Sequence, residues 1–312
     1  MFNDQTVIVT GAGNGLGRAH ALLFGQFGAN VVVNDLGTTT AGEGTSSRAA
    51  DFVVEEIVAA GGTAAPSYDS VSTDEGCRAI AATALEAFGR IDSVVHNAGI
   101  LRNAPFEDMT DEMFFPVLET HLLGAFFLSR AVWKTMTKQG YGRLVFTSSA
   151  SGVFGRADGA NYASAKAGIV GLCNALALEG EERGVLANAV MPVAVTRLAG
   201  MPDDADRTPD ADARRAEGRA MAPRSEPDWV SPLVAFLASD RCQFTHRYYS
   251  AGSGRYARIF VGVTAGWWAP GDQPPSPEDI AAHLDEIDER AQYDLPMSVF
   301  EELELIAQRH AT

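Results

Sequence analysis

The feature of this sequence that most constrains its fold is a regular alternation of short β-branched runs with longer amphipathic stretches. The predicted strands are Thr6–Thr10, Asn30–Asn34, Ala64–Tyr68, Ser93–His96, Arg143–Thr147, Ala187–Met191 and Arg258–Val263. The predicted helices lie near Leu16–Phe27, Ser47–Ala60, Asp74–Phe88, Asp111–Thr137, Tyr162–Arg183 and Pro227–Ala238. Repeated strand–helix units join parallel strands by right-handed crossovers, which place helices on both faces of the sheet. We therefore predict an α/β fold with a doubly wound parallel sheet.

The alternation covers most of the 312 residues. There is no second core pattern and no internal repeat, so we predict a single domain over residues 1–265. Inside it, about residues 194–226 carry no strand pattern, and because so long a loop is commonly functional, we expect it to be the substrate loop. Residues 266–312 are expected to form an acidic C-terminal extension, with 11 acidic and two basic residues from residue 271 onward.

The overall charge excludes some classes of partner. The chain has 24 Lys and Arg against 40 Asp and Glu, so its formal net charge is −16. This excess of negative charge disfavours nucleic-acid binding. No apolar run approaches the roughly 18–20 residues of a membrane span, and the amino terminus lacks the basic region of a signal peptide. We expect a cytoplasmic protein with no nucleic-acid and no membrane partner.

Cys77, Cys173 and Cys242 are far apart in the sequence and odd in number. No C-x-x-C motif or His/Cys cluster accompanies them, which argues against a disulfide framework and a metal site. We expect no bound metal and three buried thiols in a reducing compartment.

The first predicted strand runs into a glycine-rich turn, Thr10–Gly17 (TGAGNGLG), which opens the first helix. Glycine lets the backbone turn sharply and approach a pyrophosphate without a Cβ in the way, and the helix amino terminus offers N–H groups to the phosphates. Glycine-rich strings also serve ordinary turns, but the strand before and the helix after this one favour a dinucleotide site. The candidate binding residues are Gly11, Gly13, Asn14, Gly15, Leu16 and Gly17.

Two acids at strand ends are further candidates for cofactor binding. Asp35 ends the second predicted strand, where a carboxylate can bind the adenosine ribose hydroxyls and repel a 2′-phosphate. This position favours NAD over NADP, and Arg18 is the nearest basic candidate for a phosphate. Asp69 could meet the adenine edge, or it could be an ordinary turn residue at the end of its strand.

A serine, a tyrosine and a lysine carry the predicted chemistry. Tyr162 and Lys166 are one helical turn apart, so both project from the same helix face. Ser149 follows a predicted strand thirteen residues before the tyrosine. A phenol normally titrates near 10, and a neighbouring ammonium favours phenolate, which could serve as the base in the oxidation of an alcohol. Ser149 would hold the substrate oxygen, and Lys166 could also bind the nicotinamide ribose.

These residues, in this order and spacing, resemble those of the short-chain dehydrogenase/reductase family over nearly the whole of residues 1–265. The matching motifs are Thr10–Gly17, Asn97-Ala98-Gly99 after the fourth strand, Ser149, and Tyr162-x-x-x-Lys166. The resemblance implies a Rossmann-like fold, use of NAD or NADP, and homodimers or homotetramers formed through the long helices. It also implies that Asn97 and Gly99 belong to the cofactor site, and that Pro192 and Thr196 lie over the nicotinamide.

One residue departs from the family pattern. Family members often have an asparagine that holds a water molecule in a proton relay, and His121 stands in its place here. His121 could take part in the relay, or it could be a buried histidine bonded to a backbone carbonyl. We expect His96 to be structural.

The same histidine narrows the resemblance. Together with the runs Val31–Gly37 and Arg143–Gly152, it is similar to the (3R)-hydroxyacyl-CoA dehydrogenase unit of peroxisomal multifunctional enzyme type 2, also called 17β-hydroxysteroid dehydrogenase type 4, and to free-standing bacterial relatives. That resemblance implies oxidation of a 3-hydroxyacyl-CoA, in some cases with a steroid-derived acyl group, to the 3-ketoacyl-CoA. No hydratase or sterol-carrier pattern follows, so we expect the dehydrogenase step alone.

The segment 197–224 has six arginines and six acidic residues. Its arginines could bind the phosphates of CoA, or the segment could be a solvated lid of mixed charge. The arginines are Arg197, Arg207, Arg214, Arg215, Arg219 and Arg224.

Three hypotheses follow from the sequence. The leading one is an NAD-dependent 3-hydroxyacyl-CoA dehydrogenase, with an acyl-CoA as its small-molecule substrate. The second is a dehydrogenase for a CoA-free hydroxysteroid or other secondary alcohol that uses the same residues. The third is a non-catalytic NAD-binding sensor or scaffold, against which the intact Ser149, Tyr162 and Lys166 argue.

Overall fold

The computed structural model describes residues 1–194, 196, 208–210, 213–214, 216–217, 224–270 and 273–310. The predicted substrate loop falls mostly outside these described residues. The chain divides into two compact units, Met1–Arg258 and Ile259–Thr312, and the first ends a few residues before the boundary predicted at residue 265.

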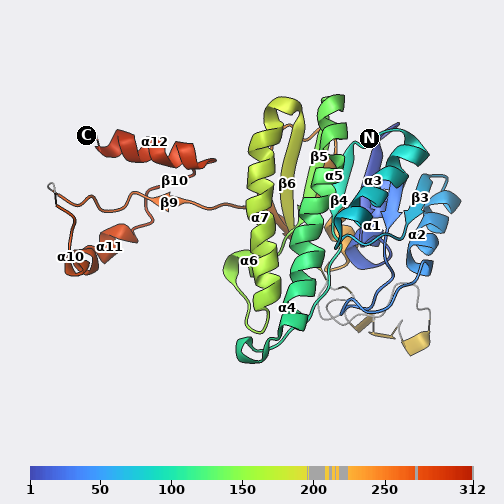
Figure 1. Ribbon diagram of the computed structural model, residues 1–312, viewed down its shortest axis with the longest axis horizontal. Helices are drawn as coiled ribbons and strands as arrows, with labels where there is room; N and C mark the ends of the chain where they lie inside the picture. Colours follow the sequence, from blue (N-terminus) through green and yellow to red (C-terminus); the bar gives the residue numbers. More distant parts are fainter. Residues whose placement is uncertain are drawn as a thin grey trace. The chain divides into compact units, whose positions relative to one another are not determined.

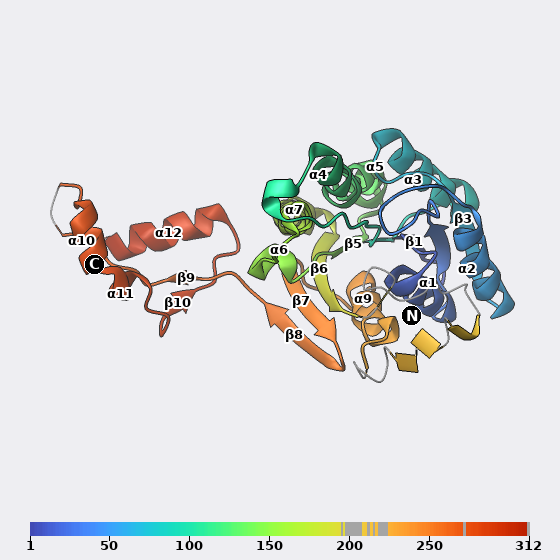
Figure 2. The same ribbon diagram turned by 90° about the horizontal axis from the view of Figure 1, so that it is seen from below.

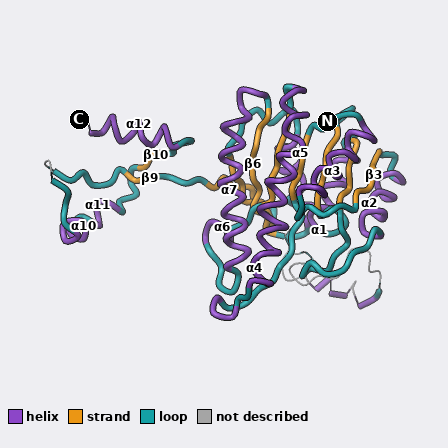
Figure 3. The backbone as a smooth tube through the Cα atoms, in the orientation of Figure 1, coloured by secondary structure: helices purple, strands orange, loops and turns teal. Residues whose placement is uncertain are grey.

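The first unit is built around one mostly parallel sheet of eight strands in the order β3-β2-β1-β4-β5-β6-β7-β8 (Figures 1 and 3). Strands β1 to β7 pair in parallel, and a two-residue turn at Ser253 and Gly254 reverses the chain into β8. The strand order reverses direction between β1 and β4, which is where ligands bind in open α/β sheets. The strands are β1 (Thr6–Thr10), β2 (Asn30–Asn34), β3 (Thr63–Ser67), β4 (Ser93–His96), β5 (Gly142–Thr147), β6 (Val185–Val193), β7 (Arg247–Gly252) and β8 (Arg255–Ile259).

Helices cover both faces of this sheet, and Figure 2 shows α3, α5 and α7 on one face and α1, α2 and α9 on the other. The central strands β1, β4 and β5 are buried along their whole length, as expected for parallel strands covered on both sides. These findings confirm the predicted α/β fold with a doubly wound sheet. The helices are α1 (Gly15–Gln26), α2 (Arg48–Ala59), α3 (Asp74–Phe88), α4 (Asp111–Leu118), α5 (Gly124–Gln139), α6 (Ser151–Phe154), α7 (Ala160–Gly180) and α9 (Ser231–Ala238), with short 3-10 turns at Phe106–Asp108, Glu181–Arg183 and Pro227–Trp229.

The end of the sheet differs from the prediction. The strand expected at Arg258–Val263 is wrong, because β7 occupies Arg247–Gly252 and pairs with β6 from Asn188↔Arg247 to Val193↔Gly252. The sequence RYYSAG has no continuous β-branched run, and its strand conformation depends on the neighbouring β6 rather than on local propensity.

The helix predicted over Asp111–Thr137 is interrupted. Helix α4 ends at Leu118, a π-helical turn, η2, spans Glu119–Leu123, and α5 begins at Gly124. π-helical turns are often found at functional sites, and this one contains His121.

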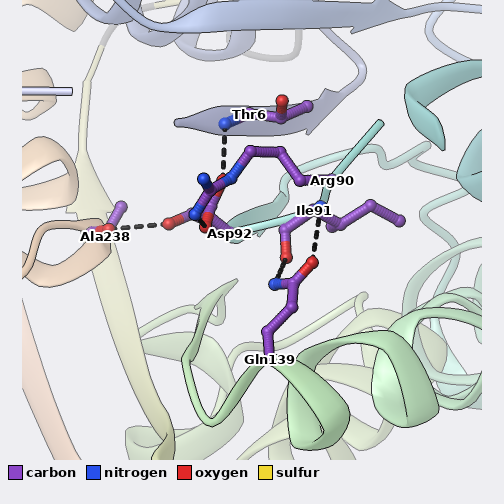
Figure 4. Close-up of polar contacts among 7 residues, drawn as sticks. Thr6, Arg90, Ile91, Asp92, Gln139 and Ala238 are labelled. Carbon is purple, nitrogen blue, oxygen red and sulfur yellow. Dashed lines mark hydrogen bonds and ion pairs between the residues drawn. The ribbon is translucent and has the colours of Figure 1, made fainter. Parts of the chain in front are cut away.

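A buried carboxylate joins β1 to β4 at the amino ends of these two strands (Figure 4). Asp92 is fully buried, accepts the backbone N–H of Thr6 at 2.8 Å, and pairs with the Arg90 guanidinium at 2.7 Å through both oxygens. Nearby, the Gln139 side chain at the end of α5 bonds to both backbone groups of Ile91. These contacts fix the start of β4 against β1 and α5.

The three thiols, Cys77, Cys173 and Cys242, are free and buried in the first unit. Burial raises the pKa of the Cys77 thiol to about 12 and also raises the pKa of Cys173 and of Cys242.

The second unit is small. It contains a two-stranded antiparallel pair, β9 (Val263–Thr264) and β10 (Tyr293–Asp294), and the helices α10 (Pro277–Ala282), α11 (Leu284–Ile287) and α12 (Val299–His310). Two aromatic stacks lie within it, Trp267 on His283 and Phe260 on Tyr293. Among the helices of the described ranges, none has the length and apolar character needed to cross a bilayer.

Candidate active site

The glycine-rich turn after β1 requires glycine because the surrounding backbone is so close. A Cβ on Gly11, which has φ +62°, would lie 2.7 Å from the Cα of Ala98 after β4. A Cβ on Gly17 would lie 2.1 Å from the carbonyl oxygen of Gly11, so the first turn of α1 packs directly on the chain that enters it. That turn of α1 carries no acidic side chain to oppose a phosphate.

This turn forms one wall of a cleft of about 280 Å³ at the carboxyl ends of β1 to β4. Its lining is compatible with a dinucleotide, with the backbone of the glycine-rich turn on one side and carboxylate and hydroxyl groups on the other. Of the predicted cofactor residues, Gly13, Gly17 and Pro192 are outside the lining, as are the catalytic candidates. The lining includes Gly11, Asn14, Gly15, Leu16, Asp35, Asp69, Asn97, Gly99 and Thr196 from the predicted set, and also Thr38, Thr39, Thr40, Gly42, Ile100, Arg102 and Thr120.

The Asp35 carboxylate lines the cleft and holds two backbone groups beside it. Its Oδ2 accepts the backbone N–H of Gly13 at 2.8 Å, and its Oδ1 accepts that of Gly37 at 2.7 Å. Arg18, the nearest basic candidate for a 2′-phosphate, instead makes a two-point ion pair with Glu56 at 2.7 and 2.9 Å. The Arg18 guanidinium is therefore held by a carboxylate of α2.

Asn97 links the two strands at the reversal of the sheet order. Its side-chain amide donates to the carbonyl oxygens of Thr10 and Gly11, both at 3.2 Å, while its backbone N–H donates to the Thr10 hydroxyl at 3.0 Å. Asn97 thus supports the strand that leads into the glycine-rich turn.

Ser149, Tyr162 and Lys166 come together where the end of β5 meets α7. The Lys166 ammonium donates to the Thr147 carbonyl at 2.5 Å, and the Ser148 hydroxyl donates to the Lys166 carbonyl at 2.8 Å. Lys166 Nζ also lies 5.5 Å from the centre of the Tyr162 ring. A hydrogen bond between Tyr162 and Ser149 is among the effects that act on the pKa of the tyrosine.

The charges in this group differ from the sequence-based expectation. Burial raises the pKa of Tyr162 above 10, and the Ser149 hydrogen bond and the nearby Arg156 charge only partly oppose it. Burial also lowers the pKa of Lys166 to about 7, so in the ligand-free protein the ammonium is not a strong, permanent cation that could favour the phenolate.

His121 lies beside the tyrosine and is buried in a neutral state. Burial, and after it the Lys166 charge, holds its pKa well below the usual 6.5. Its Nε2 is 2.9 Å from the Ile100 carbonyl and 3.2 Å from the Ile100 backbone N–H, and its ring stands edge-on to Tyr162 with 5.2 Å between ring centres. Its Nδ1 has no hydrogen-bond partner among the described residues. The contact with the Ile100 carbonyl agrees with the alternative of a buried histidine bonded to a backbone carbonyl.

His96 of β4 supports the π-helical turn η2. Its Nε2 lies 3.0 Å from the His121 carbonyl, and burial lowers its pKa to about 3. A neutral His96 can therefore donate to that carbonyl and hold the π-helical turn η2 against β4.

Sequence reasoning missed two residues at this site, Arg156 and Asn161. Arg156 is exposed but close enough to affect the Tyr162 pKa, and Asn161 is fully buried immediately before Tyr162. Neither belongs to a motif with a recognisable spacing, so local sequence gave no signal for them. In the arginine-rich segment, Arg197, Arg207, Arg215 and Arg219 lie outside the described residues.

Replacement of Gly99 tests the fit of His121. A Cβ on Gly99 would lie 2.2 Å from Cε1 of the His121 ring. We expect Gly99→Ala to lower the free energy of unfolding by about 2 kcal/mol. In the double variant Gly99→Ala/His121→Ala, the loss in free energy of unfolding should be about 1–2 kcal/mol smaller than the sum of the two single losses. Urea unfolding measures all three variants. Gly171→Ala, where a Cβ meets nothing within 4 Å, is the control and should not destabilise. Additive costs would show that the overlap does not decide the effect.

The buried Lys166 predicts a pH dependence of stability. Between its folded pKa of about 7 and the ordinary value of 10.5, the unfolded chain binds a proton that the native chain lacks, so this residue makes stability rise with pH. Lys166→Met should therefore stabilise the ligand-free protein most below pH 7, and this advantage should shrink by up to about 1.4 kcal/mol per pH unit from pH 7 to 10. Urea unfolding at pH 6, 8 and 9.5 measures the difference. The exposed Lys134, replaced in the same way, should give a difference that does not change with pH.

Comparison with known proteins places the chain in a family. The model of the short chain dehydrogenase family matches residues 5–207. A short-chain type dehydrogenase/reductase of Mycobacterium tuberculosis is 42% identical over 284 residues, which are 91% of this chain and 94% of that protein. The peroxisomal multifunctional enzyme type 2 of Mus musculus is 39% identical over 303 residues, 96% of this chain but only 39% of the mouse protein.

A solved structure extends the match through the second unit. The full-length peroxisomal multifunctional enzyme type 2 of Drosophila melanogaster superposes with a TM-score of 0.77 at 29% identity, over 99% of this chain and 49% of that one. The chain thus spans less than half the length of these multifunctional enzymes. From the matched family model, the relatives and the shared fold, we conclude that the chain belongs to the short-chain dehydrogenase/reductase family of oxidoreductases.

Proposed function

We propose that this protein oxidises a 3-hydroxyacyl-CoA to the 3-ketoacyl-CoA with NAD as the hydride acceptor. The observation that carries the proposal is the meeting of Ser149, Tyr162 and Lys166 at the end of β5, next to a cleft lined by Asp35 and the glycine-rich turn. Bound nicotinamide would take the hydride from the carbinol carbon.

In this proposal, Tyr162 is the base. Its hydroxyl oxygen accepts the proton of the substrate alcohol as the carbon–hydrogen bond breaks, so the tyrosine must be deprotonated beforehand. Burial opposes that ionisation, while the Ser149 hydrogen bond and the Arg156 charge favour it. A bound, positively charged nicotinamide ring would also favour the ionised tyrosine. Ser149 would orient the substrate oxygen toward the phenolate.

NAD rather than NADP is supported by the adenosine end of the cleft. Both oxygens of Asp35 accept backbone N–H groups, which holds the carboxylate where we propose that it meets the adenosine ribose. The Arg18 guanidinium forms an ion pair with Glu56, and Arg18 does not line the cleft.

The CoA thioester is supported by the relatives. Multifunctional enzymes of peroxisomes, including one named as a hydratase-dehydrogenase-epimerase, are 39% identical to this chain over most of its length. A steroid or sterol side-chain thioester is a candidate within this class. We further propose that the protein works as a homodimer or homotetramer, because Phe126 on α5 and Leu178 on α7 expose apolar surface on the long helices.

Replacement of the tyrosine tests the mechanism. We expect Tyr162→Phe to lower kcat for 3-hydroxyacyl-CoA oxidation by at least about a thousandfold, because the base is lost, with little change in the dissociation constant for NAD. NADH absorbance gives the rate, and fluorescence titration gives the affinity. Turnover close to wild type in this variant would refute the proposed base. Comparison of a thioester with its CoA-free analogue separates this proposal from a CoA-free alcohol dehydrogenase.

Replacement of the ribose-binding carboxylate tests the choice of cofactor. The wild-type protein should have a much higher kcat/KM with NAD than with NADP, and Asp35→Asn should reduce that ratio by about tenfold or more because the repulsive charge is removed. Steady-state rates with both cofactors measure the ratio. Glu55→Gln, which changes an exposed carboxylate of α2 outside the cleft lining, is the matched control. Equal efficiency of the wild-type protein with both cofactors would contradict the role of Asp35.

A further inference from the structure

The loop between β2 and α2, residues 36–46, forms part of the wall of the cofactor cleft. No sequence motif indicated that this loop belongs to the cleft. Thr38, Thr39, Thr40 and Gly42 of this cofactor-side loop line the cleft. Internal backbone bonds hold its shape, from Thr39 N to Glu43 O at 2.9 Å and from Ser46 N to Leu36 O at 3.0 Å. A Cβ on Gly37, which has φ +70°, would lie 1.9 Å from the Ser46 carbonyl oxygen, so the two ends of the loop are in close contact. The loop is thus a compact built element rather than a loose connection.

The cofactor-side loop is attached to the chain that follows β4. The Leu101 backbone N–H donates to the Thr40 carbonyl at 2.9 Å, and the Arg102 Nε donates to the Ala41 carbonyl at the same distance. Gly42 packs on Ile100, where a Cβ would come within 3.0 Å of the side chain. Ile100 is also the residue whose backbone bonds to His121. One short segment, residues 100–102, therefore touches both the adenosine side of the cleft and the catalytic side.

The Arg102 side chain connects this segment to helix α4. Its Nη1 donates to the Glu112 carbonyl in α4 at 2.5 Å, while its Nε holds the Ala41 carbonyl. The two acceptors are backbone carbonyls on separate elements, so the guanidinium is fixed at both ends by its planar geometry. The residue also lines the cofactor cleft.

Asn161 completes the connection to Tyr162. Its amide group is fully buried and donates to the carbonyls of Arg102 and Met113, both at 2.8 Å. Its Oδ1 accepts the backbone N–H of Tyr162 at 2.7 Å. A continuous series of hydrogen bonds thus runs from the cofactor-side loop, through Arg102 and Asn161, to the backbone of the tyrosine.

We infer that Arg102 is a positioning residue that couples occupation of the cofactor cleft to the placement of Tyr162. A dinucleotide that contacts the cofactor-side loop restrains the Ala41 carbonyl and, through Arg102, the start of α7. The inference rests on the proposed use of NAD. It assigns to Arg102 no contact with the reacting atoms.

The test compares Arg102→Ala and Arg102→Lys with the wild-type protein. Hydrogen–deuterium exchange is followed with and without NAD in peptides that cover residues 36–46 and 158–165. In the wild-type protein, NAD should slow exchange in both peptides. In Arg102→Ala, NAD should bind about tenfold more weakly, and at saturating NAD it should protect residues 36–46 but not residues 158–165. Arg102→Lys, which can hold one carbonyl but not both, should give intermediate protection.

Two further measurements keep the result interpretable. Arg78→Ala, an exposed arginine of α3 outside the cleft lining, should behave as wild type in binding and exchange. Thermal melts without NAD should show that Arg102→Ala is folded, and a folded Arg102→Ala with wild-type protection of residues 158–165 at saturating NAD would overturn the inference. Failure of the wild-type protein itself to bind NAD would overturn the proposed function and this inference with it.

Discussion

The arrangement of Ser149, Tyr162 and Lys166 depends on one crossing, where Lys166 of α7 lies against the end of β5. The Lys166 side chain donates a hydrogen bond to the Thr147 carbonyl, and the Ser148 hydroxyl donates one to the Lys166 carbonyl. A Cβ on Gly152 would lie 2.6 Å from the backbone nitrogen of Ala167, so the chain after β5 packs tightly on the same turn of helix. Ser149 is adjacent to one of these residues and Tyr162 precedes another by one helical turn, so their mutual position follows from the crossing. The arrangement requires a buried amine, and its lowered pKa is the physical consequence.

The cofactor half of the site depends on backbone rather than on cationic side chains. This explains how a chain of net charge −16 can offer a site for an anionic dinucleotide. The glycine-rich turn and the first turn of α1 supply the dipole, while Asp35 uses its charge to hold Gly13 and Gly37 in place. Among the described residues that line the cleft, Arg102 alone has a basic side chain. Its guanidinium is bonded to backbone carbonyls.

The sequence predicted the parts of the fold that local pattern decides. Strands β1 to β6 and the glycine-rich turn could be predicted because buried parallel strands and phosphate-binding turns leave strong local signals. β7 could not, since its polar sequence is held as a strand by β6. The π-helical turn η2 depends on His96, which is distant in sequence and bonds to the His121 carbonyl. Arg102 and Asn161 act through backbone carbonyls, which carry no sequence signature, so only the folded chain reveals their connection.

The burial of the three thiols has a consequence for how this protein meets oxidants and alkylating reagents. The reactive species is the thiolate, and the raised pKa values keep Cys77, Cys173 and Cys242 protonated at neutral pH. Peroxide and maleimides therefore have access to these sulfurs only when the surrounding sheet and helices open. The rate of covalent labelling then reports the opening of the fold itself, with Cys173 placed to report on the same helix that carries Tyr162 and Lys166.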